Sequence, residues 1–287
     1  MRIYPLFDTN IFYLCRVMPG HDDPCRCKNM NGISNNEIKY LRSLSQKKFR
    51  DECGVFVVEG EKMVAEALKS GFEVEKIWRE EEIGSETMAR ISSLASPSPV
   101  LAVVKKPGDV RLEGEEAASG ALGRNGLFLA LDTLRDPGNL GTIIRIADWF
   151  GVNGIFATPD TVELFNPKVV QATMGAIFRV KFHYIDLQML ADAVENAGGK
   201  LFGTFLDGQN IYEKDLSTGD CNPAVIVIGN ESNGISPQLG ARITERLFIP
   251  SYPAGIRTSE SLNAAVATAI TVAEFRRRAS GRFVTHK

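Results

Sequence analysis

Residues 126–147 read GLFLALDTLRDPGNLGTIIRIA, and this stretch decides the fold. It begins with a short apolar run, Leu127–Leu131, which predicts a strand that is buried on both faces. Pro137 and Gly138 then favour a turn, and Asn139 is expected to cap a helix. Apolar side chains recur in that helix at helical spacing, at Leu140, Ile143, Ile144 and Ala147. A strand, a turn and an amphipathic helix form the repeating unit of an α/β protein.

The same pattern continues toward the C-terminus. Further apolar runs lie at Gly154–Thr158, Phe178–His183, Lys200–Phe205, Ala224–Gly229 and Arg246–Ile249. Helical stretches are expected at Asn139–Phe150, Pro167–Ala176, Leu187–Ala197 and from about Leu262 to Arg278. Continuous apolar strands that alternate with helices predict a parallel sheet with helices on both faces. Ligands of such sheets bind beyond the carboxyl ends of the strands.

The chain before this sheet divides into three parts. Residues 1–29 show no helical or strand period, and we expect a poorly ordered extension that precedes a natural start at Met30. Residues 30–107 alternate helices and strands over a short length, which predicts a small α/β domain. Its strands are expected at Val55–Glu59, Val74–Trp78 and Val100–Val104, with a helix and turn over Glu37–Arg50 and a helix at Glu61–Ser70. Residues 108–125 are polar and glycine-rich and are expected to be a linker, or a loosely held edge segment, before a second domain at 126–287.

The composition is that of a soluble globular protein, with 44% hydrophobic and 24% charged residues among 287. The net charge of −2 argues against a surface coated with positive charge, so nucleic acid would have to bind local basic patches. One stretch without acidic residues carries such a patch, at Lys39, Arg42, Lys47, Lys48 and Arg50. The alternative is that these side chains form an ordinary solvated helix face.

The chain has five cysteines at scattered positions, an odd number that favours reduced thiols in the cytoplasm. Cys15, His21, Cys25 and Cys27 could also be a zinc site, but the Cys-x-Cys spacing is unusual and no second pair follows. We therefore expect no metal. No apolar run approaches the roughly 20 residues that span a bilayer, so no membrane association is expected.

Two further motifs follow predicted strands. Residues 224–236, AVIVIGNESNGIS, end a strand in a Gly-x-Glu-x-x-Gly turn that exposes backbone groups and places Glu231 at the edge of the sheet. Residues 247–263 run from an apolar strand through a loop to Ser261-Leu-Asn263, where Ser261 is expected to cap the last helix. Each motif also has a structural interpretation: Glu231 as a helix-capping acid, Arg145 as a surface arginine, and the last helix as tightly packed alanines.

Several common sites are missing from the sequence. No Gly-x-Gly-x-x-Gly follows the first strand, which argues against a Rossmann dinucleotide site, and no phosphate-binding loop sequence occurs. The three histidines do not pair with a plausible serine or cysteine nucleophile. The three motifs at strand ends are therefore the candidates for chemistry.

In this order, the three motifs resemble those of the SpoU/TrmH family of RNA 2′-O-ribose methyltransferases in the SPOUT superfamily. The resemblance runs from about Met30 to Arg278 and is most specific in DPGNLGTIIR and the later SLN. It implies a C-terminal α/β-knot domain, a mostly parallel sheet with a deep trefoil knot. Residues 56–60, FVVEG, resemble the start of the family's small RNA-binding domain. The resemblance further implies S-adenosylmethionine as methyl donor and a structured RNA, ribosomal or transfer, as substrate.

The resemblance also assigns roles to individual residues. Asn139, Arg145, Glu231, Ser261 and Asn263 match the polar residues of the catalytic motifs. Gly229, Ile249, Leu262 and Thr204 are expected around the methyl donor. The loop between Pro250 and Ser261 is longer than the usual family loop, so its contacts do not carry over.

We expect Arg145 to hold an RNA phosphate and the developing alkoxide, with Glu231 orienting it, because arginine stays protonated and is a poor base. A homodimer is expected to pair through apolar residues of the last helix, namely Ala264, Ala265, Val266, Ala269, Val272 and Phe275. Two other functions stay open: a catalytically idle RNA-binding protein of the same fold, and a binding module for another adenine-containing ligand.

Overall fold

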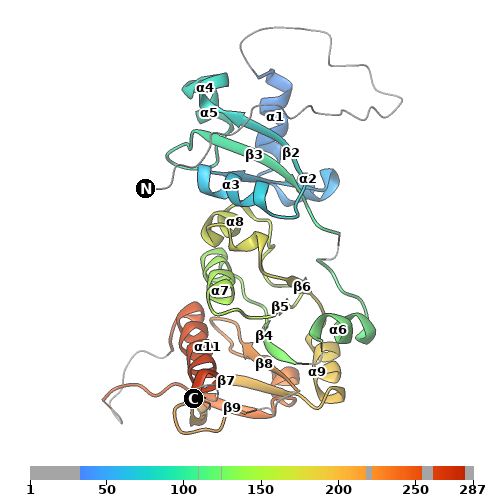
Figure 1. Cartoon of the computed structure of the whole chain (residues 1–287), viewed down its shortest axis with the longest axis vertical. Helices are drawn as coiled ribbons and strands as arrows, with labels where there is room; N and C mark the ends of the chain where they lie inside the picture. Colours follow the sequence, from blue (N-terminus) through green and yellow to red (C-terminus); the bar gives the residue numbers. More distant parts are fainter. Residues whose placement is uncertain (1–32, 109, 124, 218–221, 254–260, 282–287) are drawn as a thin grey trace, which may run out of the picture.

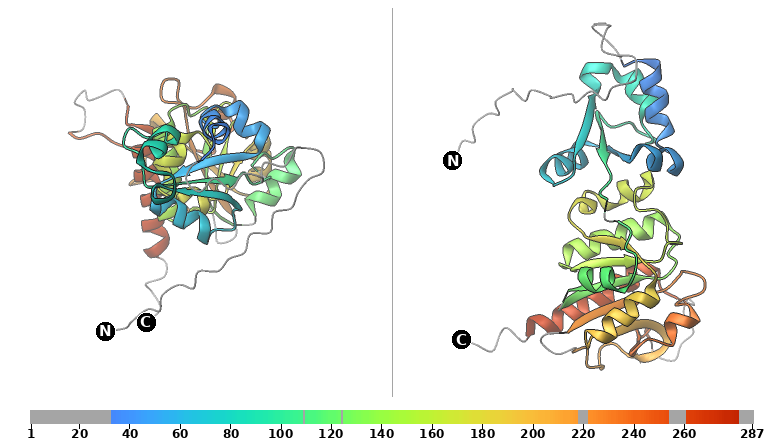
Figure 2. Two further views of the ribbon diagram at one scale, coloured as in Figure 1. Left: turned by 90° about the horizontal axis from the view of Figure 1, so that it is seen from above. Right: turned by 90° about the vertical axis from the view of Figure 1, so that its right-hand side faces the viewer.

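A computed structural model of the chain describes residues 33–108, 110–123, 125–217, 222–253 and 261–281. The extension expected at residues 1–29 lies outside them. Within this part, the strands form one sheet of three and one sheet of six (Figure 1). The right-hand view of Figure 2 also shows that the smaller sheet lies beyond the larger one along the molecule.

The smaller sheet is antiparallel, in the order β1-β3-β2. Its strands are β1 Val55–Glu59, β2 Val74–Arg79 and β3 Val100–Lys105. Its helices are α1 Asn35–Ser43, α2 Lys47–Cys53, α3 Glu61–Lys69, α4 Glu80–Ile83 and α5 Ser85–Ile91. All three strands begin where the apolar runs predicted them. Buried residues from both faces of β3 supply two hydrophobic clusters, one of which continues into the larger sheet.

The larger sheet has the order β6-β5-β4-β8-β7-β9, and every pair in it is parallel. Its strands are β4 Gly126–Leu131, β5 Gly154–Ala157, β6 Phe182–Tyr184, β7 Lys200–Asn210, β8 Pro223–Ile228 and β9 Glu245–Phe248. The predicted parallel sheet is confirmed. Its two central strands, β4 and β8, are almost wholly buried because helices cover both faces.

Helices lie on both sides of this sheet (Figure 1). The helices of one face are α7 Pro137–Trp149, α8 Pro167–Thr173 and α11 Ala264–Gly281, with a short 3₁₀ turn at Ala176–Phe178. Those of the other face are α6 Glu115–Leu122, α9 Leu187–Asn196 and α10 Pro237–Gly240. Alternate residues of β4 serve the two faces: Leu129 joins the α7 cluster, whereas Phe128 joins the α9 cluster.

The expectation that residues 108–125 form a linker is wrong for the second half of this segment. Most of its second half is helix α6, in which Ala118 and Leu122 are 0% and 1% exposed and pack in the cluster of α9. Arg111 forms a parallel bridge with Tyr184, which extends the edge of the sheet. The segment is polar on average, but two apolar side chains four positions apart suffice to bury one face of a short helix.

The two sheets are joined by a buried interface. The ring of Phe56 in β1 lies 4.6 Å from the ring of Phe165, which precedes α8. Arg50 is only 2% exposed, donates to the carbonyl oxygens of Leu44 and Ser45 at 2.8 Å, and forms an ion pair with Glu163. The expected RNA-binding role of Arg50 is therefore wrong, because its guanidinium is used inside the protein.

No helix among the described residues is long and apolar enough to cross a membrane. Within the same residues, no group of three or more histidine, cysteine or acidic side chains is placed to hold a metal ion. The expected zinc alternative at Cys15, His21, Cys25 and Cys27 lies in the part of the chain that the structure does not describe.

Candidate functional site

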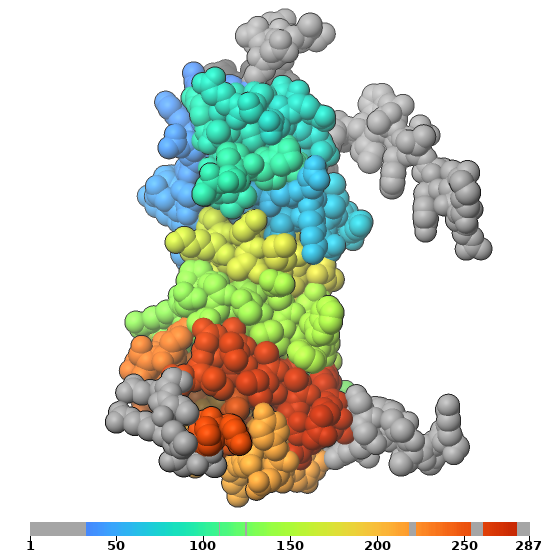
Figure 3. All heavy atoms as spheres, turned by 90° about the vertical axis from the view of Figure 1, so that its left-hand side faces the viewer, coloured from blue at the N-terminus to red at the C-terminus, as the bar shows by residue number. Residues whose placement is uncertain are grey.

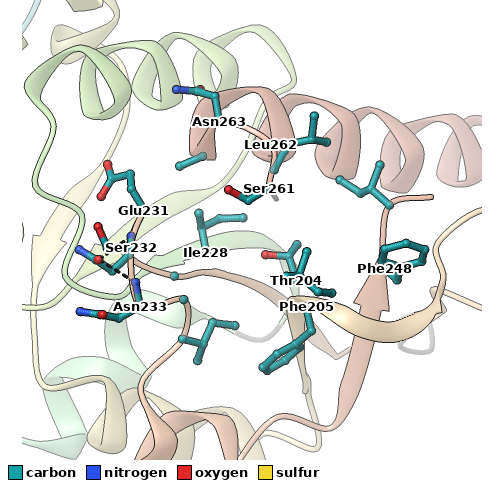
Figure 4. A pocket seen from close by; sticks show the side chains of 18 of the residues that line it. Thr204, Phe205, Ile228, Glu231, Ser232, Asn233, Phe248, Ser261, Leu262 and Asn263 are labelled. Atoms are coloured by element: carbon teal, nitrogen blue, oxygen red, sulfur yellow. Dashed lines mark hydrogen bonds between the residues drawn. The ribbon is translucent and has the colours of Figure 1, made fainter. Parts of the chain in front are cut away.

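A pocket of about 1200 Å³ opens at the carboxyl ends of β8 and β9, beside the middle of β7 and the start of α11 (Figure 4). The four residues expected around a methyl donor, Gly229, Ile249, Leu262 and Thr204, all line it. Glu231, Ser261 and Asn263 line it as well. The structure thus brings residues from the second and third motifs to one cavity, at the edge of the sheet where ligands of parallel sheets bind.

The turn after β8 forms one wall of the pocket. A side chain on Gly229 would place its Cβ 2.2 Å from the backbone carbon of Gly234, so this position requires glycine. Asn230 and Gly234 exchange two backbone hydrogen bonds of 2.9 Å, which close the turn. Gly234 has a φ of +66°, a conformation that glycine adopts without strain. The close approach of the two ends directs Glu231 outward at the mouth of the pocket.

One chain of side-chain hydrogen bonds joins the three motifs. Asn263 donates from Nδ2 to Oδ1 of Asn139 at 2.8 Å. Asn139 in turn donates from Nδ2 to Oε1 of Glu231 at 3.0 Å. Figure 4 shows Glu231 and Asn263 on the same side of the pocket, away from Phe248. A carboxylate oriented by a neighbouring amide is a suitable acceptor for a hydroxyl group of a ligand.

The caps of two helices differ from the expectation by two or three residues. Asp136, not Asn139, is the N-cap of α7, and its Oδ1 accepts the backbone N–H of Asn139 at 2.7 Å. This leaves the Asn139 side chain free to reach the pocket. Asn263, not Ser261, holds the start of α11, because its Oδ1 accepts from the N–H groups of Ala265 at 3.0 Å and Val266 at 3.2 Å. Asn263 therefore links the helix start to the polar chain.

Arg145 does not contact Glu231 in this chain, contrary to the expectation. It is exposed and is not among the described residues that line the pocket. It follows Asn139 by six positions in α7, which places it about 9 Å farther along the axis and about 240° around it. The carboxylate of Glu231 has Asn139 as its partner instead.

The side of the pocket away from Glu231 is aromatic, a feature that the sequence analysis missed. Phe205 and Phe248 line it, together with Ile228. Arg246 lies over the ring of Phe205 at 3.5 Å from its centroid and forms an ion pair with Asp207. Its hydrogen bond lowers the pKa of the Asp207 carboxyl. The pocket thus has a polar end and an aromatic end, which suits a ligand with a flat ring and a polar tail.

Asp132, Asn230 and Ser236 belong to a second polar group, of which Asn230 lines the pocket and Asp132 lies behind its wall. Asp132 is 4% exposed at the end of β4 and accepts the backbone N–H of Ser236 at 2.7 Å. Asn230 donates to the carbonyl oxygen of Thr133 at 2.7 Å. The one signal that points to Asp132 in the sequence is its place directly after an apolar strand.

The family models match both parts of the chain. Residues 126–273 match the SpoU rRNA methylase family, and residues 35–106 match the MRM3-like substrate binding domain. A 23S rRNA (guanosine(2553)-2′-O)-methyltransferase of Bacillus subtilis is 28% identical over 264 residues, which cover 87% of this chain and 99% of that protein.

Solved structures give the same result. A TrmH-family protein from Porphyromonas gingivalis is 38% identical, with a TM-score of 0.73 over 86% of this chain and 99% of that one. An rRNA methyltransferase from Sinorhizobium meliloti with bound AdoMet is 28% identical, with a TM-score of 0.75 over 86% of this chain and 97% of that one. Since the SpoU model alone matches more than half of the residues, the chain belongs to the SpoU rRNA methylase family.

Proposed function

We propose that this protein transfers the methyl group of S-adenosylmethionine to a ribose 2′-hydroxyl of ribosomal RNA. The observation that carries the proposal is the hydrogen-bonded chain Asn263–Asn139–Glu231, in which Asn139 joins two residues that line the pocket. The family match and the named activity of the Bacillus subtilis relative support it. A catalytically idle RNA-binding protein would need neither a ligand pocket nor three polar side chains joined by hydrogen bonds beside it.

The pocket fits the methyl donor in size and in chemistry. Its volume of about 1200 Å³ exceeds what a nucleoside with an amino-acid tail requires, and its aromatic side would take the adenine ring. Backbone groups around Gly229, Ile249 and Leu262 would hold the donor, and Thr204 would close one side. When bound, the donor supplies an electrophilic methyl group.

The remaining task of the protein is to align the ribose oxygen with that methyl group and to hold one proton. Glu231 lies at the pocket mouth with its carboxylate oriented by Asn139, so it would accept the hydrogen bond of the 2′-hydroxyl. Ser261 and Asn263, which also line the pocket, would hold the ribose by further hydrogen bonds. Arg145, which is exposed, would grip an RNA phosphate outside the pocket.

RNA affinity would come from residues 30–107, but from a smaller patch than the sequence suggested. Lys39 and Arg42 are exposed on α1, three positions apart, so they share a face. Lys47 and Lys48 are also exposed, but each forms an ion pair within α2, with Asp51 at 2.6 Å and Glu52 at 3.8 Å. We expect Lys39 and Arg42 to contribute more to phosphate binding than the paired lysines.

The homodimer stays a proposal, with a changed interface. Four of the six apolar residues expected to form it, Ala264, Ala265, Val272 and Phe275, are at most 8% exposed and belong to the core of this chain, so their assignment is wrong. Figure 3 shows α11 (red) on the surface directly beside α7 (light green). Near these helices Leu262 is 47%, Val266 48% and Trp149 84% exposed, and these side chains suit an interface.

The finer assignments rest on the family resemblance and on the sequence. We propose a trefoil knot in the larger domain, a smaller domain at 30–107, and a larger domain that begins before residue 126 because it includes α6. We also propose that the protein holds no metal and is located in the cytoplasm, which its odd number of cysteines favours. The helix α6 makes the segment 108–125 part of the larger fold and not a free linker.

The proposed activity is tested with purified protein, S-adenosylmethionine and unmodified ribosomal RNA, followed by mapping of 2′-O-methyl groups. We expect one new methylated nucleotide with the wild-type chain and little with Glu231→Gln. Calorimetry of S-adenosylmethionine runs in parallel. Binding of the donor without methylation of any RNA would favour the idle protein, and absence of donor binding would favour a module for another adenine-containing ligand.

A further inference from the structure

The carboxylate of Asp132 joins the loop after β4 to the turn after β8. Its Oδ2 accepts the backbone N–H of Ser236 at 2.7 Å, and its Oδ1 accepts the hydroxyl of Thr133 at 3.2 Å. Its own backbone N–H donates to the carbonyl of Ile228 at 2.9 Å. Ile228 precedes the turn and Ser236 ends it, so this one residue contacts both ends of the segment that carries Glu231.

Asn230 makes the second connection between the two loops. Its Nδ2 donates to the carbonyl oxygen of Thr133 at 2.7 Å. Its Oδ1 accepts the N–H groups of Ser232 at 2.9 Å and Asn233 at 3.2 Å. Although Asn230 lines the pocket, both ends of its side-chain amide are thus engaged by the protein. It folds the turn and fastens it to the loop after β4.

Thr133 is the point where these contacts meet. Its φ is +58°, a left-handed conformation that a β-branched residue rarely adopts. Its N–H donates to the hydroxyl of Thr158 at 2.9 Å, its carbonyl accepts from Asn230, and its hydroxyl donates to Asp132. A strained residue persists only where its surroundings determine it fully. Asp132 and Asn230, together with Thr158, therefore hold the chain at Thr133, where the path to Asn139 begins.

The two loops carry the two partners of the central hydrogen bond. Asn139 stands at the start of α7, after the Thr133 loop, and Glu231 stands in the turn that Asp132 and Asn230 hold. Asp132 is buried and is not among the described residues that line the pocket, so it would not touch a ligand bound there. Any effect of Asp132 on the reaction must pass through the residues that it positions.

We propose that Asp132 and Asn230 are positioning residues for methyl transfer, which keep Glu231 within hydrogen-bond distance of Asn139. This inference rests on the proposed function, since it assigns a role within that reaction. It predicts that loss of either connection slows methyl transfer more than it weakens binding of RNA.

The test compares variants that remove or keep each connection. Asp132→Ala removes the acceptor of the Ser236 N–H, whereas Asp132→Asn keeps one oxygen for it. Asn230→Asp keeps an oxygen for the turn but replaces the donor that faces the carbonyl of Thr133. Asp192→Ala is the matched control, because it removes an exposed carboxylate that pairs with Arg242 on the opposite face of the sheet.

Single-turnover methylation of ribosomal RNA is measured for each variant, with RNA affinity and the unfolding temperature in parallel. We expect Asp132→Ala and Asn230→Asp to slow turnover about 10- to 100-fold, the effect of a misplacement of about an ångström. Asp132→Asn should recover most of the rate, and Asp192→Ala should retain all of it. RNA affinity should change less than threefold.

A double-mutant cycle separates positioning from a general structural role. If Asp132 acts through Glu231, adding Asp132→Ala to Glu231→Gln should slow the reaction little further. Multiplied losses would overturn the proposal. If Asp132→Ala does not fold, Asn230→Asp takes its place in the cycle. If the wild-type chain methylates RNA and both Asp132→Ala and Asn230→Asp keep the wild-type rate, the positioning role alone is overturned. If the wild-type chain methylates no RNA, the proposed function is overturned, and this inference with it.

Discussion

Asn139 donates a hydrogen bond to Glu231 across 92 positions of sequence, with 3.0 Å between Nδ2 and Oε1. The bond closes because β4 and β8 are parallel neighbours, so the helix that follows one strand and the turn that follows the other meet at one edge of the sheet. Asn263 extends the connection to the start of α11. The three motifs therefore act as one unit.

Glu231→Gln tests whether the charge of this carboxylate matters to the reaction. Glutamine keeps an oxygen that can accept from Asn139 but cannot hold a proton in the same way. We expect turnover to fall about 10²–10⁴-fold, the range for a positioned acid–base group, with S-adenosylmethionine affinity nearly unchanged. Glu116→Gln, which alters an exposed glutamate on α6, is the control. A Glu231→Gln protein with the wild-type rate would make the carboxylate merely structural.

The RNA-binding patch is tested by the salt dependence of affinity. Replacing Lys39 and Arg42 by glutamine should weaken RNA binding and reduce the slope of log affinity against log salt by about one unit per lost phosphate contact. Replacing Lys47 and Lys48 should have a smaller effect, because both already pair with acidic residues. If the two double variants weaken RNA binding equally, Lys39 and Arg42 contribute no more than the paired lysines. If neither variant weakens it, these residues form an ordinary solvated helix face that does not bind RNA.

Local pattern predicted most of the fold. β1 occupies the predicted residues, because a β-branched run lies between Gly54 and Gly60 and has no helical alternative. Helix α6 was missed since averaged composition hides two buried residues in a polar segment. The cap of α7 was misplaced because Asp136 and Asn139 are both good cap residues. Proline at position 137 favours Asp136, since proline fits the first helical position.

The site was less predictable than the fold, because its contacts join residues far apart in the chain. We expected Glu231 to orient Arg145, but the start of α7 places Asn139 beside the Glu231 carboxylate instead. The burial of Arg50 depends on Glu163, which lies 113 positions later. The hydrophobic period of a short segment does not show which distant residue its side chains will contact. Gly229 and Glu231 follow the end of a predicted strand, and the family resemblance added the other residues expected around the pocket.

Arg50→Met tests the interface between the two sheets. The guanidinium is buried and paired with Glu163, which also lies 3.3 Å from Lys106. Breaking a buried pair costs about 3–5 kcal/mol, and we expect the lower end because Lys106 still faces the carboxylate. Lys47→Met, at an exposed pair of the same helix, should cost less than about 1 kcal/mol. Denaturant unfolding measures both, and equal losses would show that Arg50 contributes no more than a surface charge.

Glu274 should make the protein sensitive to acid. Hydrogen bonds from Arg277 and Arg278 lower the pKa of its carboxyl from 4.5 to about 2. A pKa lowered by folding stabilises the folded state above the unfolded value, and this contribution is lost as the pH falls from about 4.5 toward 2. Arg277 is largely exposed, so solvent screening leaves about 1–2 kcal/mol. The unfolding free energies of wild type and Glu274→Gln should differ by this amount at neutral pH and converge near pH 2.

We expect Arg145 to link the pocket to the RNA substrate. It is exposed on α7, the helix whose first turn supplies Asn139, and it does not line the pocket among the residues described. A guanidinium in this place can grip a phosphate with two parallel hydrogen bonds, which the ammonium group of lysine cannot do. We therefore expect Arg145→Lys to lose most activity although the net charge is kept.

Arg145→Ala should lower turnover about 10²–10⁴-fold, while affinity for S-adenosylmethionine stays within about threefold of wild type, because the pocket that would hold the donor lies elsewhere. Arg90→Ala, an exposed arginine of the smaller domain, is the control. Single-turnover methylation at saturating RNA separates the chemical step from RNA binding. Wild-type turnover in Arg145→Ala would make the residue a surface cation, since a phosphate grip that aligns the ribose must act on the rate. If donor binding falls together with the rate, the residue supports the fold of the pocket, and the assignment to RNA phosphate is wrong.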